Sequence, residues 1–262
     1  MPILELSRAR LLALPIRLLS AALAMTFFVA LPGFAQSGGT DGADRPDFSG
    51  LYFPAGFARR TPNPPPYTAA AQELAEQYEA QFRTQDDPGR YCIWPGMPRA
   101  PWGAPFSVEV FQRDQDLTIY WEGYGMYRKV YMADHNPPEA LLPSRMGHSI
   151  AHWEGDTLVI ETTDLRPYPY MNRFATSSSA VLVERMRQEQ REVDGQTKTF
   201  LIDDIVVTDP KLYTEPVLIH AEAELREDLQ LLEYTCTDTL WENYLLENGL
   251  TLPDVDALPD PQ

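Results

Sequence analysis

The stretch "GHSIAHWEGDTLVIET", from Gly147 to Thr162, decides the fold class. Ile150 and Trp153 precede the turn "EGD" at 154–156, and the run "TLVIET" follows it. Short runs rich in β-branched and aromatic residues are typical of strands, and a short acidic connector containing glycine is typical of a hairpin turn. The stretch therefore predicts two antiparallel strands at about 147–153 and 157–163.

The two histidines of this stretch, His148 and His152, are four residues apart. On a strand that spacing separates side chains by about 13 Å, so both cannot bind one metal ion. The sequence also has no Cys or His cluster, no glycine-rich phosphate loop and no dinucleotide fingerprint. We therefore expect neither a metal nor another cofactor.

Period-two alternation of apolar and polar residues runs along most of the rest of the chain. It predicts further strands at about 107–113, 117–122, 126–133, 180–193, 197–207, 217–226 and 229–236. A helix is predicted at 68–83, where apolar residues recur every three or four positions, and a short one in "DTLWENYLLENG", from Asp238 to Gly249. The fold expected for residues 67–250 is a mainly β single domain, an antiparallel meander β-barrel of lipocalin-like type with a helix before and after it. A two-sheet β-sandwich is the alternative.

Both ends of the chain have other compositions. Residues 1–35 contain three arginines, an apolar run, and Gly33 and Ala35 at the positions of a signal-peptidase site. We expect cleavage after Ala35, a periplasmic or secreted protein, and no stable membrane insertion once the leader is removed. Residues 36–66 are predicted to be a flexible, proline-rich lead-in, and 251–262 a disordered acidic tail.

Charge and cysteine content narrow the possible partners and chemistry. The chain has 21 Lys and Arg against 38 Asp and Glu, a net charge of −17. So acidic a protein repels phosphate backbones, and nucleic acid is not an expected partner. The only two cysteines, Cys92 and Cys236, are expected to form a disulfide in an oxidising compartment, with a nucleophilic thiol as the alternative.

Several segments together resemble a large family of secreted bacterial proteins. These segments are "GHSIAHWEGDTLVIET", "VERMR", "TDPKLYTEP", "LLEYTC" and the upstream "CIWPGMP". The resemblance covers roughly residues 90–245. Most members have no assigned activity, so the resemblance implies export but no reaction. His152 and "MADHNPPEAL" depart from the family pattern, and the second departure points to a different ligand specificity.

Ionisable side chains stand within otherwise apolar rows of several strands, where burial is costly unless they are paired. The candidates for acid–base catalysis and for orienting an oxyanion are His148, Glu184, Arg128 and Arg185. The candidates for ligand contact are Glu109, Tyr120, Tyr131, Glu161 and Asp203. Six of these candidates have a structural alternative: an Arg128–Glu184 ion pair, an outer position for Glu109 and Glu161, a turn or bulge for Asp203, and a wall position for His148.

The function expected from these features is binding of a small apolar or aromatic molecule inside the barrel. Possible wall residues are Tyr120, Tyr124, Tyr127, Tyr131, Trp121 and Trp153. One hypothesis is a cofactor-free acid–base enzyme of the isomerase, cyclase, lyase or hydrolase type. A second is a non-catalytic ligand-binding or carrier protein. A third, an envelope interaction protein, would have no internal cavity and an exposed apolar patch.

Overall fold

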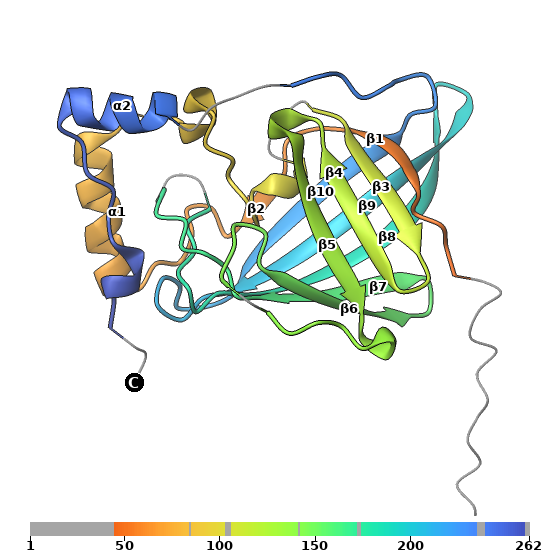
Figure 1. The fold of residues 1–262 in the computed structure, drawn as a ribbon, viewed down its shortest axis with the longest axis horizontal. Helices are drawn as coiled ribbons and strands as arrows, with labels where there is room; N and C mark the ends of the chain where they lie inside the picture. Colours follow the sequence, from red (N-terminus) through yellow and green to blue (C-terminus); the bar gives the residue numbers. More distant parts are fainter. Residues whose placement is uncertain are drawn as a thin grey trace, which may run out of the picture. The chain divides into compact units, whose positions relative to one another are not determined.

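A closed β-barrel forms the body of the protein (Figure 1). The computed structural model describes residues 45–259, apart from 84, 103–105, 141, 172–173 and 235–238. The strands are β1 (Gly50–Pro54), β2 (Arg59–Thr61), β3 (Val108–Arg113), β4 (Asp116–Trp121), β5 (Met126–Met132), β6 (His148–Glu154), β7 (Thr157–Thr163), β8 (Val181–Val193), β9 (Gln196–Thr208) and β10 (Val217–Leu225).

The strand order is β1-β3-β4-β5-β6-β7-β8-β9-β10, and pairing of β10 with β1 closes these nine strands into the barrel. The predicted lipocalin-like barrel is therefore confirmed, and the sandwich alternative is not. The predicted hairpin is also confirmed, since β6 and β7 pair from His148↔Thr163 to Glu154↔Thr157. Gly155, with φ of +60°, turns the chain between them.

The chain before the predicted domain belongs to the barrel, so the boundary at residue 67 was wrong. Tyr52 of β1 is fully buried and pairs with both Val108 and Leu225. The short β2 pairs only with β10, through Arg59, Arg60 and Thr61. Strands β1 and β2 were not predicted because prolines and glycines surround them, and their apolar runs are too short to show a clear hydrophobic period.

One strand pair departs from the predicted antiparallel meander. Strands β5 and β6 run parallel, with Val130 opposite Ser149. A parallel pair needs a crossover of a dozen residues or more, and the segment between β5 and β6, residues 133–147, has that length. Its prolines at 137, 138 and 143 disfavour a regular return strand.

Two helices pack beside the barrel: α1 (Ala69–Gln81) and α2 (Thr239–Asn248). Thr68 caps α1, because its side chain accepts a hydrogen bond from the Ala71 amide. Tyr78 and Phe82 stack at 4.4 Å between ring centroids, and Phe82 lies 6.3 Å from Trp241 of α2. The predicted helices are thus confirmed; Asp238 lies outside the described residues.

The C-terminal residues depart from their prediction. Residues 229–234, expected to start a ninth strand, form no strand, and 235–236 lie outside the described residues. The predicted disordered tail packs on the domain as far as it is described. Val255, within the short helix η5 (Val255–Ala257), is only 1% exposed, and the Asp256 carboxylate accepts hydrogen bonds from Ser178. Burial of Val255 and Leu258 holds this acidic segment in place.

Candidate functional site

The inside of the barrel contains an ion pair in which every guanidinium nitrogen has a partner. Arg128 of β5 donates two hydrogen bonds to Glu184 of β8, and its Nε donates to Ser149 Oγ at 3.0 Å. Its remaining contacts are Thr162 Oγ1 at 2.7 Å and Met97 Sδ at 3.6 Å. The structural Arg128–Glu184 pair considered from the sequence is confirmed, and it connects four neighbouring strands.

Side chains fill the space around this pair. The cavity lined by Arg128, Asp203, Met186 and neighbouring apolar residues measures about 10 Å³. A single water needs roughly 10–15 Å³. The cavity beside Arg128 and Asp203 therefore has no room for an organic ligand. Asp203 does face this interior, as predicted for a ligand-contacting residue, but it lines only the small cavity.

His148 faces away from Glu184. In β6 the side chains of Ser149 and Ala151 are fully buried, so those of His148 and Ile150 point outward. The His148 ring lies tilted against that of Tyr131, with 5.8 Å between ring centroids. Trp153, in the same row as Ser149 and Ala151, packs against the fully buried Phe48, with 5.3 Å between ring centroids. The predicted His148–Glu184 proton pair is therefore not assembled.

The other predicted site residues also lie outside the interior. Arg185 is exposed and pairs with Glu154 at 2.9 Å. Glu161 is exposed, and Glu109, Tyr120 and Tyr131 are half-buried beside buried, inward-facing neighbours. The outer position considered for Glu109 and Glu161 is confirmed. Of the predicted set, the structure brings Arg128, Glu184 and Asp203 together inside the barrel, and it pairs His148 with Tyr131 and Glu109 with Tyr120 on the outer wall.

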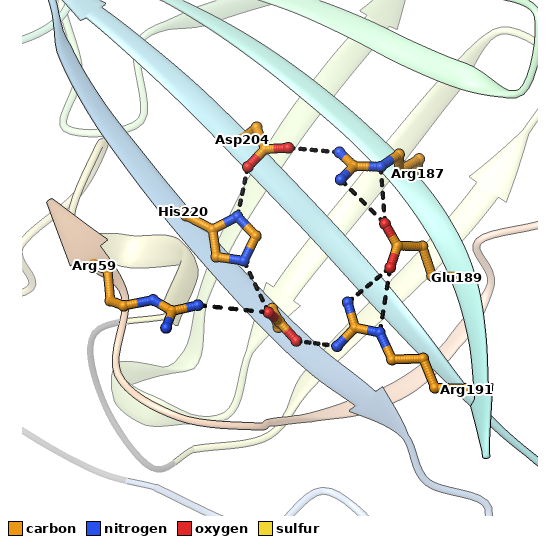
Figure 2. Close-up of polar contacts among 7 residues, drawn as sticks. Arg59, Arg187, Glu189, Arg191, Asp204 and His220 are labelled. Carbon is orange, nitrogen blue, oxygen red and sulfur yellow. Dashed lines mark hydrogen bonds and ion pairs between the residues drawn. The ribbon is translucent and has the colours of Figure 1, made fainter. Parts of the chain in front are cut away.

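A second group of charges, on the outer wall, was not predicted as a site (Figure 2). We call it the outer ion network: Arg59, Arg187, Glu189, Arg191, Asp204, His220 and Glu222. Ion pairs link all but Arg59 into a closed ring across β8, β9 and β10. Glu222 forms ion pairs with Arg59, Arg191 and His220.

His220 lies between two carboxylates of this ring. Its Nδ1 is 2.6 Å from Asp204 Oδ1, and its Nε2 is 2.9 Å from Glu222 Oε1. These hydrogen bonds, with Glu222 and then with Asp204, raise the pKa of His220 above its ordinary value of 6.5. In its charged form His220 donates to both carboxylates, so both ring nitrogens are engaged.

Stability should depend on the protonation of His220. Because its pKa is higher in the folded than in the unfolded state, its contribution is fully present below the unfolded value of 6.5 and is lost as pH rises through the folded value. We expect Tm to fall more steeply in the parent than in His220→Gln as pH rises above the unfolded pKa of 6.5. Calorimetry on both proteins measures this, and parallel slopes would contradict it.

A hollow beside His220 has the size of a ligand site. It measures about 500 Å³, within the roughly 300–1,000 Å³ typical of small-molecule pockets. Two cross-strand rows border it. Thr61, Leu218 and Val206 form an aliphatic row, and Arg59, His220 and Asp204 form a polar row next to it. A molecule with an apolar body and a polar group would match both rows.

A third space, at one end of the barrel, is smaller. Aromatic residues including Trp94, Trp121 and Tyr124 line a cavity of about 30 Å³ beside Arg99. Arg99 donates hydrogen bonds to the Asp87 carboxylate and, from Nη1, to the Tyr168 hydroxyl oxygen at 3.0 Å. Roughly 30 Å³ is the share of one water molecule in the liquid. Trp121 and Tyr124 thus meet, as expected of wall residues, but around a space too small for an organic ligand.

The sequence did contain a signal for the outer site. In "VLIHAEAEL" the polar residues His220, Glu222 and Glu224 alternate with small or apolar ones, which predicts one polar face on β10. The polar face of β10 alone did not predict a hollow, because Arg59 and Thr61, which also line it, come from a segment that was predicted to be a flexible lead-in. Only the pairing of β2 with β10 brings them to His220.

The described residues define a lipocalin-like β-barrel, a class of fold that can bind small molecules. Among them no group of three or more His, Cys, Asp or Glu side chains could hold a metal ion, and no helix is long and apolar enough to cross a membrane. No protein-family model, curated protein or solved structure matches the chain.

Proposed function

We propose that this protein binds a small organic acid with an apolar body in the hollow on its outer wall. The observation that carries the proposal is the contrast between two spaces: about 500 Å³ beside Arg59 and His220, against about 10 Å³ in the cavity beside Arg128 and Asp203. This keeps the small apolar or aromatic ligand expected from the sequence and moves its site from the interior to the wall.

Arg59 supplies the reason for an acidic ligand. Its side chain is 75% exposed, and its ion pair with Glu222 is long, at 3.8 Å. Glu222 is already bound by His220 and Arg191, so it does not depend on Arg59. With His220 protonated, the charges of the closed ring cancel, and Arg59 adds one positive charge beside the hollow. A ligand carboxylate can therefore bind Arg59 without displacing a strong partner.

The geometry favours binding over turnover. A general base needs a free nitrogen within hydrogen-bond reach of the substrate, but both nitrogens of His220 already face protein carboxylates. Arg128 and Glu184 have side chains that are 1% and 0% exposed, so a ligand on the wall does not reach them. We therefore propose the non-catalytic carrier rather than the acid–base enzyme.

The proposal is tested with the fluorescent aromatic anion 8-anilinonaphthalene-1-sulfonate. Arg59→Gln should weaken its binding by about tenfold or more, because a hydrogen bond to a charged group contributes roughly 1.5–3 kcal/mol. Arg113→Gln is the matched control, since Arg113 is also an exposed arginine with one acidic partner, Asp116. Equal affinity in the parent and Arg59→Gln would overturn the proposal. Chemical conversion of a bound acid, followed by mass spectrometry, would favour the enzyme instead.

We also propose that the protein is exported, cleaved after Ala35 and oxidised at Cys92 and Cys236. The leader-like composition of residues 1–35 and the family resemblance support this proposal. Cys236, the predicted partner of Cys92, lies outside the described residues. Mass spectrometry of protein recovered from a periplasm should give a chain starting at Gln36, with a peptide linked through both cysteines. A chain starting at Met1 would contradict export.

A further inference from the structure

Two hollows meet at Arg59 and His220. Besides the larger hollow, a second one of about 180 Å³ is lined by Ala55, Gly56, Phe57, Arg59, His220 and Glu222. The larger one is lined by the same Arg59 and His220. Arg59 and His220 therefore stand at the boundary between the two spaces, so a ligand acid group at Arg59 has room on either side of it.

The two hollows differ in the chemistry of their walls. The larger one has the aliphatic row of Thr61, Val206 and Leu218. The smaller one has the turn between β1 and β2, which carries Phe57 with 79% of its surface exposed. The Ala55 amide donates to the Glu222 carbonyl at 2.9 Å, so this turn is fixed to β10 next to the outer ion network.

Phe57 is an unusual residue at such a position. Burying an aromatic side chain is strongly favourable, yet Phe57 takes part in none of the ring–ring contacts found in the described part of the chain. It therefore offers an open ring face beside Arg59. An aromatic ring of a ligand would gain more there than an aliphatic group of the same size, because ring pairs interact beyond their buried area.

We infer that the ligand is an aryl-substituted aliphatic acid, with its ring on Phe57, its carboxylate on Arg59 and its aliphatic part on Leu218. This inference rests on the proposed function, and it makes Phe57 the residue that selects an aromatic ring. The carboxylate lies between the two apolar groups of such an acid, as Arg59 lies between the two hollows.

The test compares one enantiomer of 2-phenylbutyrate with the corresponding 2-cyclohexylbutyrate, which has a saturated ring. Calorimetry on the full protein should show the phenyl acid binding about 2–10-fold tighter, the factor given by roughly 0.5–1.5 kcal/mol of ring–ring interaction. Phe57→Leu should abolish this preference and leave the affinity for the cyclohexyl acid within about twofold. Phe111→Leu, which changes an exposed phenylalanine on β3, should preserve the preference.

The outcomes separate the two proposals. Equal binding of both acids to the parent, or an unchanged preference in Phe57→Leu, overturns the inference about Phe57 and leaves the wall site intact. Failure of both acids to bind the parent overturns the inference and also counts against the proposed function. Arg59→Gln should weaken both acids alike, since it removes the partner of the group that they share.

Discussion

Replacing Arg128 by Ala is expected to lower the free energy of unfolding by about 3–5 kcal/mol. The substitution leaves Glu184, which is fully buried, without its bidentate partner. It also removes the hydrogen bonds to Ser149 and Thr162, through which one side chain joins β5 to β6 and β7. For a protein of this size the loss corresponds to a drop in Tm of roughly 6–20 °C, measured by calorimetry and urea unfolding.

A double-variant cycle separates the pair from the rest of this effect. Arg128→Met combined with Glu184→Met removes both charges and keeps apolar volume inside the barrel. The double variant should be more stable than Arg128→Met alone, because no unpaired buried carboxylate remains. Two results would contradict a stabilising role for the Arg128–Glu184 pair. One is a loss of less than about 1 kcal/mol in the free energy of unfolding of Arg128→Ala, and the other is a double variant that is the least stable of the set.

Gly147→Ala should cost about 2–5 kcal/mol, the second large effect. Gly147 has φ of +68°, which an alanine adopts only at a cost of roughly 1–2 kcal/mol. An added Cβ would also stand 2.5 Å from Thr162 Cγ2 and 2.5 Å from the Thr163 carbonyl oxygen. Relieving that contact must shift β7. The shift would disturb Thr162, whose hydroxyl accepts a hydrogen bond from Arg128. Urea unfolding measures the loss.

Gly155→Ala is a matched control within the same hairpin. Gly155 has a similar φ of +60°, but an added Cβ would meet no atom within 4 Å. It should therefore cost only the backbone part, about 1–2 kcal/mol. Equal losses at the two glycines would show that the crowding against β7 is unimportant.

Local sequence patterns predicted the strands that are long and joined by short turns. The β6–β7 and β8–β9 hairpins follow from strand-like runs around "EGD" and "VDGQ", because both signals lie within a few residues. The pairing of Tyr52 with Leu225, and the parallel pairing of Val130 with Ser149, depend on contacts between distant segments. No local period encodes such contacts, so the closing strand and the parallel pair could not be predicted.

The candidate site was predicted less well than the fold. Arg128 and Glu184 were found because a charge within an apolar row needs a buried partner. His148 was assigned to the wrong face, since in a strand a shift of one residue exchanges the inner and outer rows. Ile150 beside His148 suggested an inner row, but the buried Ser149 and Ala151 and the core-packed Trp153 form the inner row of β6. Arg59 reaches His220 only through long-range pairing.

The position of β1 between β3 and β10 has a kinetic consequence. The pair Tyr52↔Leu225 joins segments from near the two ends of the described chain, and Tyr52↔Val108 joins segments on either side of α1. Topologies rich in such distant contacts fold slowly. Until residues 50–54 dock, β3 and β10 each present an unpaired edge, which is a template for another chain. The segment that closes the barrel thus also protects the folding protein from aggregation.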